Sequence, residues 1–278
     1  GMMKDPALLT YLDNTANKKG NPNENLAREI LELHTMGVGS GYTQADIVEF
    51  AKALTGWTVG NLANSLAEPG KFFFAPARHE PGNQTVLGKR YADNGHGTGL
   101  EVLRDLAAHR ATAKHIALKL ARHFIAQDPP AELVQRLEAN FLETGGDLAA
   151  VSRVLVEAPQ SWSAEPAKVV PPYDFLVSLV RGFELEHRPL EILRLTNELG
   201  QPLWRPPAPA GWPDGDTSWA APSALRERLR VAEVVARRVN ASADPRSAAA
   251  EVLGEDMSEA TRQAVARAET REQGFELL

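Results

Sequence analysis

Hydrophobic residues recur at spacings of three and four along most of the chain, which is the period of an amphipathic helix. After Thr43, for example, Ile47, Phe50 and Leu54 share one helical face. Asp46 stands three residues after Thr43, so the two side chains can form a variant of the capping box that begins a helix. Similar capping signals return along the chain, and the whole pattern predicts about ten helices.

Two segments interrupt this helical period. Residues 71–74 and 85–88 have strand-like composition and flank a connection that contains proline and glycine, so we predict one β-hairpin inserted after the third helix. Residues 201–222 contain six of the 19 prolines and three of the five tryptophans. Because so many prolines exclude the interior of a helix, we predict a rigid Pro/Trp-rich loop there.

The predicted architecture is mainly α, an irregular bundle of helices with the inserted hairpin. A chain of 278 residues can bury the core of one large domain or of two ordinary ones. We expect a single helical domain over residues 2–278, with a division into 2–165 and 166–278 as the alternative. Residues 275–278 stop within an apolar helical pattern without a stop signal, so the last helix is expected to be cut short.

Composition excludes several classes of function. Thirty basic residues against 36 acidic ones give a net charge of -6, so no overall basic field predicts binding to nucleic acid. No apolar run approaches the roughly 18 residues of a membrane span. The chain has no cysteine, which excludes disulfides, zinc–thiolate sites, iron–sulfur clusters and thiol catalysis.

Two polar residues fall on or beside the apolar face of the helix predicted over residues 23–37. His34 lies within that face and Glu29 lies at its edge. They could act as a general base or as metal ligands. In an α-helix, however, they would be about 140° apart, so they cannot reach one metal ion unaided. The alternative is that each forms a hydrogen bond to a neighbouring helix.

Two further histidines lie in predicted loops, where functional residues are common. His79 is followed by Glu80, and His96 lies between two glycines near Asp93. With His34 they could bind a divalent metal, although their spacing matches no metal motif; the alternative is an ordinary role in turns. The glycine-rich residues 95–99 could offer backbone amides to an anion, but they read more simply as a flexible turn.

The tryptophans of the Pro/Trp-rich loop form the strongest compositional signal. Trp204, Trp212 and Trp219 could provide a stacking platform for a sugar or for a proline-rich peptide. The alternative is structural, because large aromatic side chains usually fill gaps over neighbouring helices.

Several segments together resemble the bacterial family known as domain of unknown function 1800. They are spread over nearly the whole chain: 23–35, 41–44, 53–57, 78–82, 85–88, 113–117, 199–203 and 211–213. The resemblance implies a mainly helical protein and supplies no established reaction or catalytic residues. It also implies a partial chain, because members are typically longer and have a further helical region before the first residue here.

The resemblance suggests a partner as well. Members of the family are often encoded beside a second uncharacterised family with sulfatase-like features and export signals, which implies a sulfatase-like partner and a periplasmic or envelope location. No secretory signal is recognisable within this chain, so a cytoplasmic location is the alternative.

Two functions are therefore predicted, and whether the protein is an enzyme is left open. The first is a binding or accessory module that acts with a partner protein through the Pro/Trp-rich loop. The second is a metal-assisted hydrolase that uses Glu29, His34, His79 and also His96.

Overall fold

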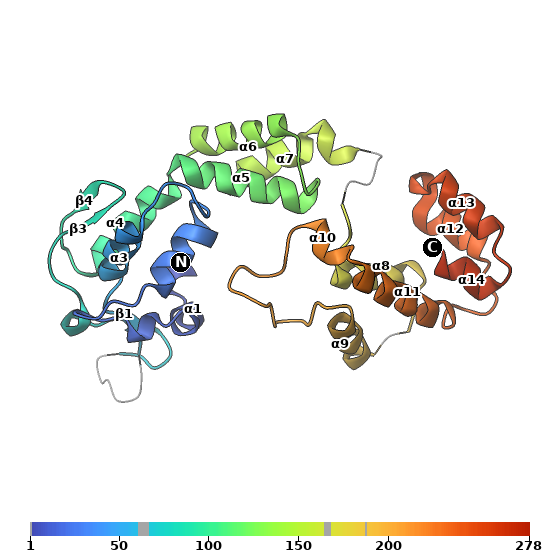
Figure 1. The fold of residues 1–278 in the computed structure, drawn as a ribbon, viewed down its shortest axis with the longest axis horizontal. Coiled ribbons are helices and arrows are strands. Elements are labelled where there is room, and N and C mark those ends of the chain that lie inside the picture. Colours follow the sequence, from blue (N-terminus) through green and yellow to red (C-terminus); the bar gives the residue numbers. More distant parts are fainter. Residues whose placement is uncertain (1, 61–66, 164–167, 187) are drawn as a thin grey trace. The chain divides into compact units, whose positions relative to one another are not determined.

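The computed structural model describes residues 2–60, 67–163, 168–186 and 188–278 (Figure 1). The chain divides into two compact units. Unit 1 comprises the residues up to 121 together with 129–161, and unit 2 comprises residues 122–128 and 162–278.

The mainly α class is confirmed. The described residues contain fourteen α-helices, more than the ten expected, because several are only one or two turns long. Those that begin in unit 1 are α1 (Pro6–Tyr11), α2 (Asn25–Glu29), α3 (Gln44–Ala53), α4 (His96–Ala107), α5 (Arg110–Phe124), α6 (Ala131–Glu143) and α7 (Leu148–Glu157). Those of unit 2 are α8 (Pro172–Gly182), α9 (Pro189–Glu198), α10 (Asp216–Trp219), α11 (Pro222–Ala236), α12 (Pro245–Leu253), α13 (Glu259–Ala266) and α14 (Arg271–Glu276).

The inserted β-structure is confirmed, but the predicted pairing of its strands was wrong. Four strands form two separate antiparallel pairs: β1 (Trp57–Val59) with β2 (Phe72–Phe74), and β3 (Gln84–Val86) with β4 (Lys89–Tyr91). The second pair turns at Leu87 and Gly88, whose φ angles of 51° and 75° suit a tight two-residue hairpin turn. These two residues therefore end a strand that we expected to include them.

The capping box at Thr43 is confirmed, and it also holds the second hairpin. The Thr43 hydroxyl accepts a hydrogen bond from the Asp46 backbone N–H, and the Asp46 carboxylate accepts one from the Thr43 N–H. The same carboxylate accepts a hydrogen bond of 2.6 Å from the Leu87 N–H. Helix α3 is thereby tied to a turn 41 residues further along the chain.

A π-helix replaces the second half of the helix predicted over residues 23–37. Helix α2 ends at Glu29, and residues Ile30–His34 form the π-helix. Gly37 follows with a φ of 88°, and a Cβ atom there would lie 2.6 Å from Nδ1 of His115. Because a π-helix bonds residue i to i+5, side chains five residues apart come closer around the axis than in an α-helix. The predicted separation of 140° between Glu29 and His34 was therefore wrong.

Each unit has its own hydrophobic core. In unit 1 the largest fully buried side chains include Phe50, Leu54 and Trp57. In unit 2, helices α8, α9 and α11 meet around Leu176, Leu195 and Val231. None of the helices in the described ranges is long and apolar enough to cross a bilayer.

Candidate functional site

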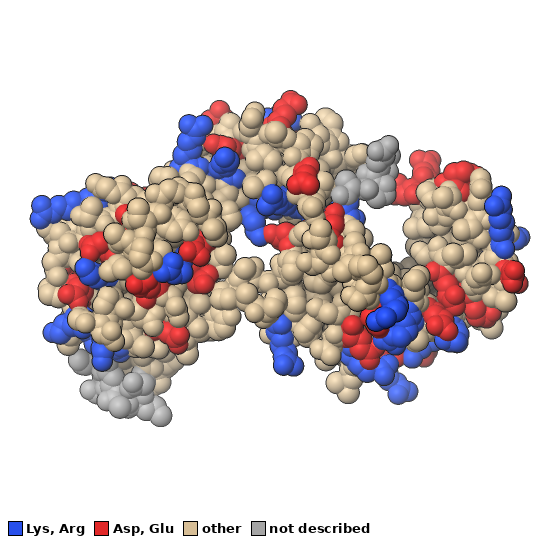
Figure 2. All heavy atoms as spheres, viewed as in Figure 1, with Lys and Arg blue, Asp and Glu red and all other residues tan. Residues whose placement is uncertain are grey.

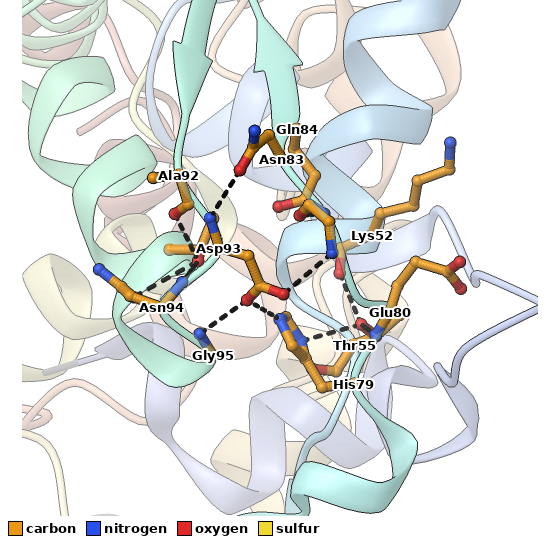
Figure 3. Close-up of polar contacts among 12 residues, drawn as sticks. Lys52, Thr55, His79, Glu80, Asn83, Gln84, Ala92, Asp93, Asn94 and Gly95 are labelled. Carbon is orange, nitrogen blue, oxygen red and sulfur yellow. Dashed lines mark hydrogen bonds and ion pairs between the residues drawn. The ribbon is translucent and has the colours of Figure 1, made fainter.

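A cluster of polar contacts in unit 1 surrounds His79 (Figure 3). His79 follows the short 3₁₀ turn Pro76–Arg78 after β2, Asp93 lies just beyond β4, and Thr55 lies just beyond α3. The side chain of His79 is only 7% exposed, whereas that of Asp93 is 30% exposed. The cluster therefore joins three connections that are far apart in sequence.

Both ring nitrogens of His79 face oxygen atoms. Nε2 lies 3.2 Å from the Asp93 carboxylate, and Nδ1 lies 3.0 Å from the Thr55 carbonyl. The Thr55 hydroxyl donates its proton to the Lys52 carbonyl at 2.5 Å and accepts from the Glu80 N–H at 2.7 Å. It therefore has no proton left for His79. Each ring nitrogen of His79 therefore has an oxygen neighbour within the cluster.

Asp93 is the acceptor that completes the cluster. Its carboxylate accepts hydrogen bonds from the Gly95 N–H at 3.0 Å and from the Gly82 N–H at 2.9 Å. The hydrogen bond from Gly95, then that from Gly82, and then His79 lower the pKa of Asp93, while partial burial opposes them. Asp93 is thus held as an anion that closes the loop between β2 and β3 onto the start of α4.

This arrangement surrounds both ring nitrogens of His79 with groups of the protein itself. A general base needs an unprotonated nitrogen within reach of the proton that it removes. Both nitrogens of His79 are instead occupied within the cluster. The geometry suits a structural histidine that fixes loops, which is the alternative that the sequence left open.

His96 lies in an aromatic environment. Its ring centroid is 5.3 Å from that of Trp57, 5.4 Å from that of Phe72 and 5.8 Å from that of Phe74. Its Nε2 is buried with no hydrogen-bond partner among the described residues. Burial, and then the positive charge of Lys4, lower the pKa of His96. His96 is therefore a neutral packing residue on the first turn of α4.

Glu29 precedes the π-helix and His34 is its last residue, and both are half-buried. Burial, followed by the nearby charge of Glu32, raises the pKa of Glu29, while Arg28 opposes this shift. Burial lowers the pKa of His34. Both groups are therefore shifted toward their neutral forms, and such shifts also occur at functional sites.

The four candidate ligands do not meet in one place. Across the described ranges, no three His, Asp or Glu side chains are grouped so that they could hold a metal ion. His79 and His96 both contact the ring of Phe74, whereas Glu29 and His34 belong to the start and the end of the π-helical segment. The hydrolase hypothesis thus stays a prediction, without a metal site of described residues to support it.

The three tryptophans of the Pro/Trp-rich loop have three different surroundings. Trp219 is buried, and its Nε1–H donates to the Pro213 carbonyl at 3.2 Å. Trp212 is half-buried, with its ring centroid 6.5 Å from that of Trp219. Trp204 is 96% exposed. Trp219 thus fills the interior, whereas Trp204 and Trp212 face solvent to different extents, and the stacking platform stays a prediction.

Trp212 and Trp219 line one side of a pocket in unit 2 with a volume of about 480 Å³. Aromatic and proline side chains make up most of its wall, and Lys168, Asp174 and Gln201 add polar groups. The Lys168 ammonium donates to the carbonyls of Arg122 and Asp214, which fixes it in the wall. Mostly aromatic walls with a few polar groups are typical of ligand sites.

Some of these residues could not be found from the sequence. Thr55 joins the cluster through its hydroxyl, and nothing in the sequence around it predicts that role. The one available signal was that segments 53–57 and 78–82, which contain Thr55 and His79, both belong to the family resemblance. Phe124 and Tyr173 line the pocket beside the tryptophans, but they come from α5 and α8. Only the fold brings them to the loop.

Fold and sites together define a mainly helical protein of two units, with a loop-fixing polar cluster in one and a tryptophan-lined pocket in the other. The model of the family described as "Protein of unknown function (DUF1800)" matches residues 1–276, so the chain belongs to this family. No curated protein and no solved structure gives a significant match to the chain.

Proposed function

We propose that this chain is a binding or accessory module that acts with a partner protein through the Pro/Trp-rich loop of unit 2. The observation that carries the proposal is Trp204, a 96% exposed tryptophan with a φ of 59°. A left-handed backbone costs a bulky residue roughly 1–2 kcal/mol. An exposed side chain gains little packing within its own chain in return, so we assign Trp204 to an interaction with another molecule.

The surroundings of Trp204 support this assignment. The Arg205 N–H donates to the Pro202 carbonyl at 3.2 Å, which closes a turn with Trp204 at the position that normally favours glycine. The residues from Trp204 to 210 are all exposed, and three of them are prolines. Figure 1 shows this stretch as a loop between α9 and α10. A loop stiffened by proline loses little conformational entropy when it binds.

The pocket beside Trp212 supports the same function. Its aromatic and proline walls suit either the stacking of a sugar ring or the docking of a proline-rich segment. The sulfatase-like protein suggested by the family resemblance is the first partner to test.

The experiment measures binding of the chain to the purified sulfatase-like protein, to a short polyproline peptide and to a soluble glucan oligosaccharide. Trp204→Gly relieves the left-handed strain while it removes the ring, so it should raise the free energy of unfolding by about 0.5–1 kcal/mol and weaken partner binding about tenfold. Trp212→Ala should weaken binding at the pocket to a similar degree.

Trp162→Ala is the matched control, because Trp162 is 74% exposed and lies outside the loop. It should leave binding within about twofold of the native value. If none of the three probes binds the native chain, or if Trp204→Gly and Trp212→Ala bind as well as Trp162→Ala does, the proposed function is wrong.

A further inference from the structure

A second apolar surface of unit 2 lies beside the Pro/Trp-rich loop. It is a groove of about 430 Å³ between α8 and α9, with Leu203 of the loop at its edge. We call it the α8–α9 groove. Its lining residues are Tyr173, Val177, Val180 and Arg181 of α8, Pro189, Ile192 and Leu193 of α9, and Leu203.

Helix α8 has apolar side chains on more than one side. At 100° per residue, Leu176 and Leu179 fall on one side, and these two pack into the core that includes Val231 of α11. Tyr173 and Val177 fall on the adjoining side and line the groove instead. Helix α8 therefore presents apolar side chains both to its own core and to the groove.

Helix α9 supplies the other wall of the groove. Leu195 is buried in the core, whereas Leu193 lines the groove and is 44% exposed. Tyr173 across the groove is 41% exposed. Contiguous exposed apolar side chains flanked by polar residues are typical of protein interaction sites.

The charge around the groove selects its partner. Arg181 is the one charged side chain in the described lining, and it forms no ion pair within the described residues. Arg205, next to Trp204 and Leu203, is likewise exposed and forms no ion pair there. A second copy docked at this surface would bring a second pair of unpaired arginines to it, which is unfavourable. A partner with carboxylates would instead complement both.

We infer that the α8–α9 groove binds an acidic amphipathic helix of the partner protein. Its apolar stripe lies between Val177 and Leu193, and its carboxylates pair with Arg181 and Arg205. A groove between two helices suits a third helix, because ridges of side chains from one helix fit between those of its neighbours. This inference rests on the proposed function, since it assumes that the chain acts by binding a partner, and it adds the chemistry of that partner.

The test uses labelled synthetic peptides of about four helical turns and the full chain, with fluorescence anisotropy as the readout. One peptide carries leucine on one face and glutamate elsewhere; the second has lysine in place of each glutamate; the third has the composition of the first with the amphipathic order scrambled. We expect saturable binding of the first peptide, and binding of the other two weaker by about tenfold or more.

Variants of the groove locate the binding. Leu193→Asp should weaken binding of the acidic peptide by about tenfold, and Arg181→Glu should weaken it and strengthen binding of the lysine peptide. Arg226→Glu is the matched control, because Arg226 is an exposed arginine on α11 outside the groove. It should change neither affinity more than about twofold.

Three results would overturn the inference: equal affinity for the acidic and lysine peptides, equal effects of Arg181→Glu and Arg226→Glu, or a dimer of the native chain that Leu193→Asp dissociates, which would assign the groove to a second copy. Binding of the sulfatase-like protein that depends on Trp204 but not on Leu193 would overturn this inference alone. Binding of the sulfatase-like protein that depends neither on Trp204 nor on Leu193 would overturn the proposed function as well.

Discussion

At the scale of single residues, histidine, aspartate and threonine side chains, which are often catalytic in other proteins, hold loops together in this one. His79 has both nitrogens engaged, and Asp93 accepts hydrogen bonds from two glycine N–H groups as well as from His79. Thr55 uses its one proton on a backbone carbonyl. These contacts hold backbone segments together, because each of them joins a side chain to a different connection of unit 1.

Because Asp93 acts as an ionised acceptor, replacing it should lower the free energy of unfolding by an amount that depends on pH. Asp93→Asn should lower the free energy of unfolding by about 1 kcal/mol at neutral pH, because the amide is a weaker acceptor for Gly82, Gly95 and His79. The pKa of Asp93 is lowered in the folded state. Its ionised form therefore adds stability above the ordinary aspartate pKa of about 3.9, and this is lost as the pH falls through the lower folded value.

Urea unfolding at neutral pH and near pH 3 checks this prediction. The difference between the native chain and Asp93→Asn should shrink at the lower pH. Asp256→Asn, at an exposed position, is the control and should show little difference at either pH. A difference for Asp93→Asn that grows as the pH falls would contradict the assignment.

At the scale of elements, small residues decide how closely the elements of unit 1 approach one another. The glycine-rich residues 95–99, expected as a flexible turn, include the first turn of α4. A Cβ atom on Gly99 would lie 2.9 Å from Cζ2 of Trp57 and 3.1 Å from Cδ2 of Leu54. Glycine at this position therefore allows α4 to pack directly on the core. Gly37, which follows the π-helix, likewise allows the His115 side chain to approach the backbone closely.

Gly99→Ala should consequently destabilise the protein, although alanine normally favours a helix by about 1 kcal/mol over glycine. We expect the free energy of unfolding to fall by about 1–3 kcal/mol, because the added methyl overpacks a closed core. Trp57→Phe removes the ring atom nearest to that methyl. In a double-mutant cycle the two substitutions together should therefore cost less than the sum of their separate effects. Additive costs would show that the contact between Gly99 and Trp57 is unimportant.

At the scale of the whole molecule, the chain builds two units with different surfaces and separate cores. Unit 1 contains the polar cluster, the aromatic cluster and both hairpins, and unit 2 contains the tryptophans, their pocket and the α8–α9 groove. On the face shown in Figure 2, acidic and basic side chains are interspersed among the described residues, without a large area of one sign. The proposed interactions accordingly rest on local features of unit 2 and not on a large area of one charge.

The separate core of unit 1 predicts that it folds by itself. A chain of residues 2–161 contains all of the buried cluster around Phe50, Leu54 and Trp57. It should keep a helical circular dichroism spectrum and unfold cooperatively on heating, because single domains of this size usually do so. A gradual, uncooperative thermal transition would show that unit 1 needs unit 2. The full chain, heated under the same conditions, is the reference.

The sequence determined the features that depend on local periodicity and on residue identity. The spacing of Ile47, Phe50 and Leu54 predicted α3, and Thr43 with Asp46 predicted its capping box, because a helix repeats every 3.6 residues and its first N–H groups need acceptors. The absence of helix from residues 201–215 was equally predictable, since proline cannot continue a helix, whereas the loop predicted over residues 201–222 also contains the short helix α10. The segments spread along the chain identified the family, and its model matches residues 1–276.

Tertiary structure decided which distant residues meet. Strand β2 pairs with β1 rather than with β3, because strand pairing depends on contacts that composition does not encode. The π-helix at residues 30–34 changes which side chains share a face, and no local signal announced it. Thr55 and Asp93 reach His79 from separate connections, and Tyr173 reaches Trp212 from another helix. Such long-range contacts depend on how the elements pack against one another. The local sequence determines only which side chains each element contributes to those contacts.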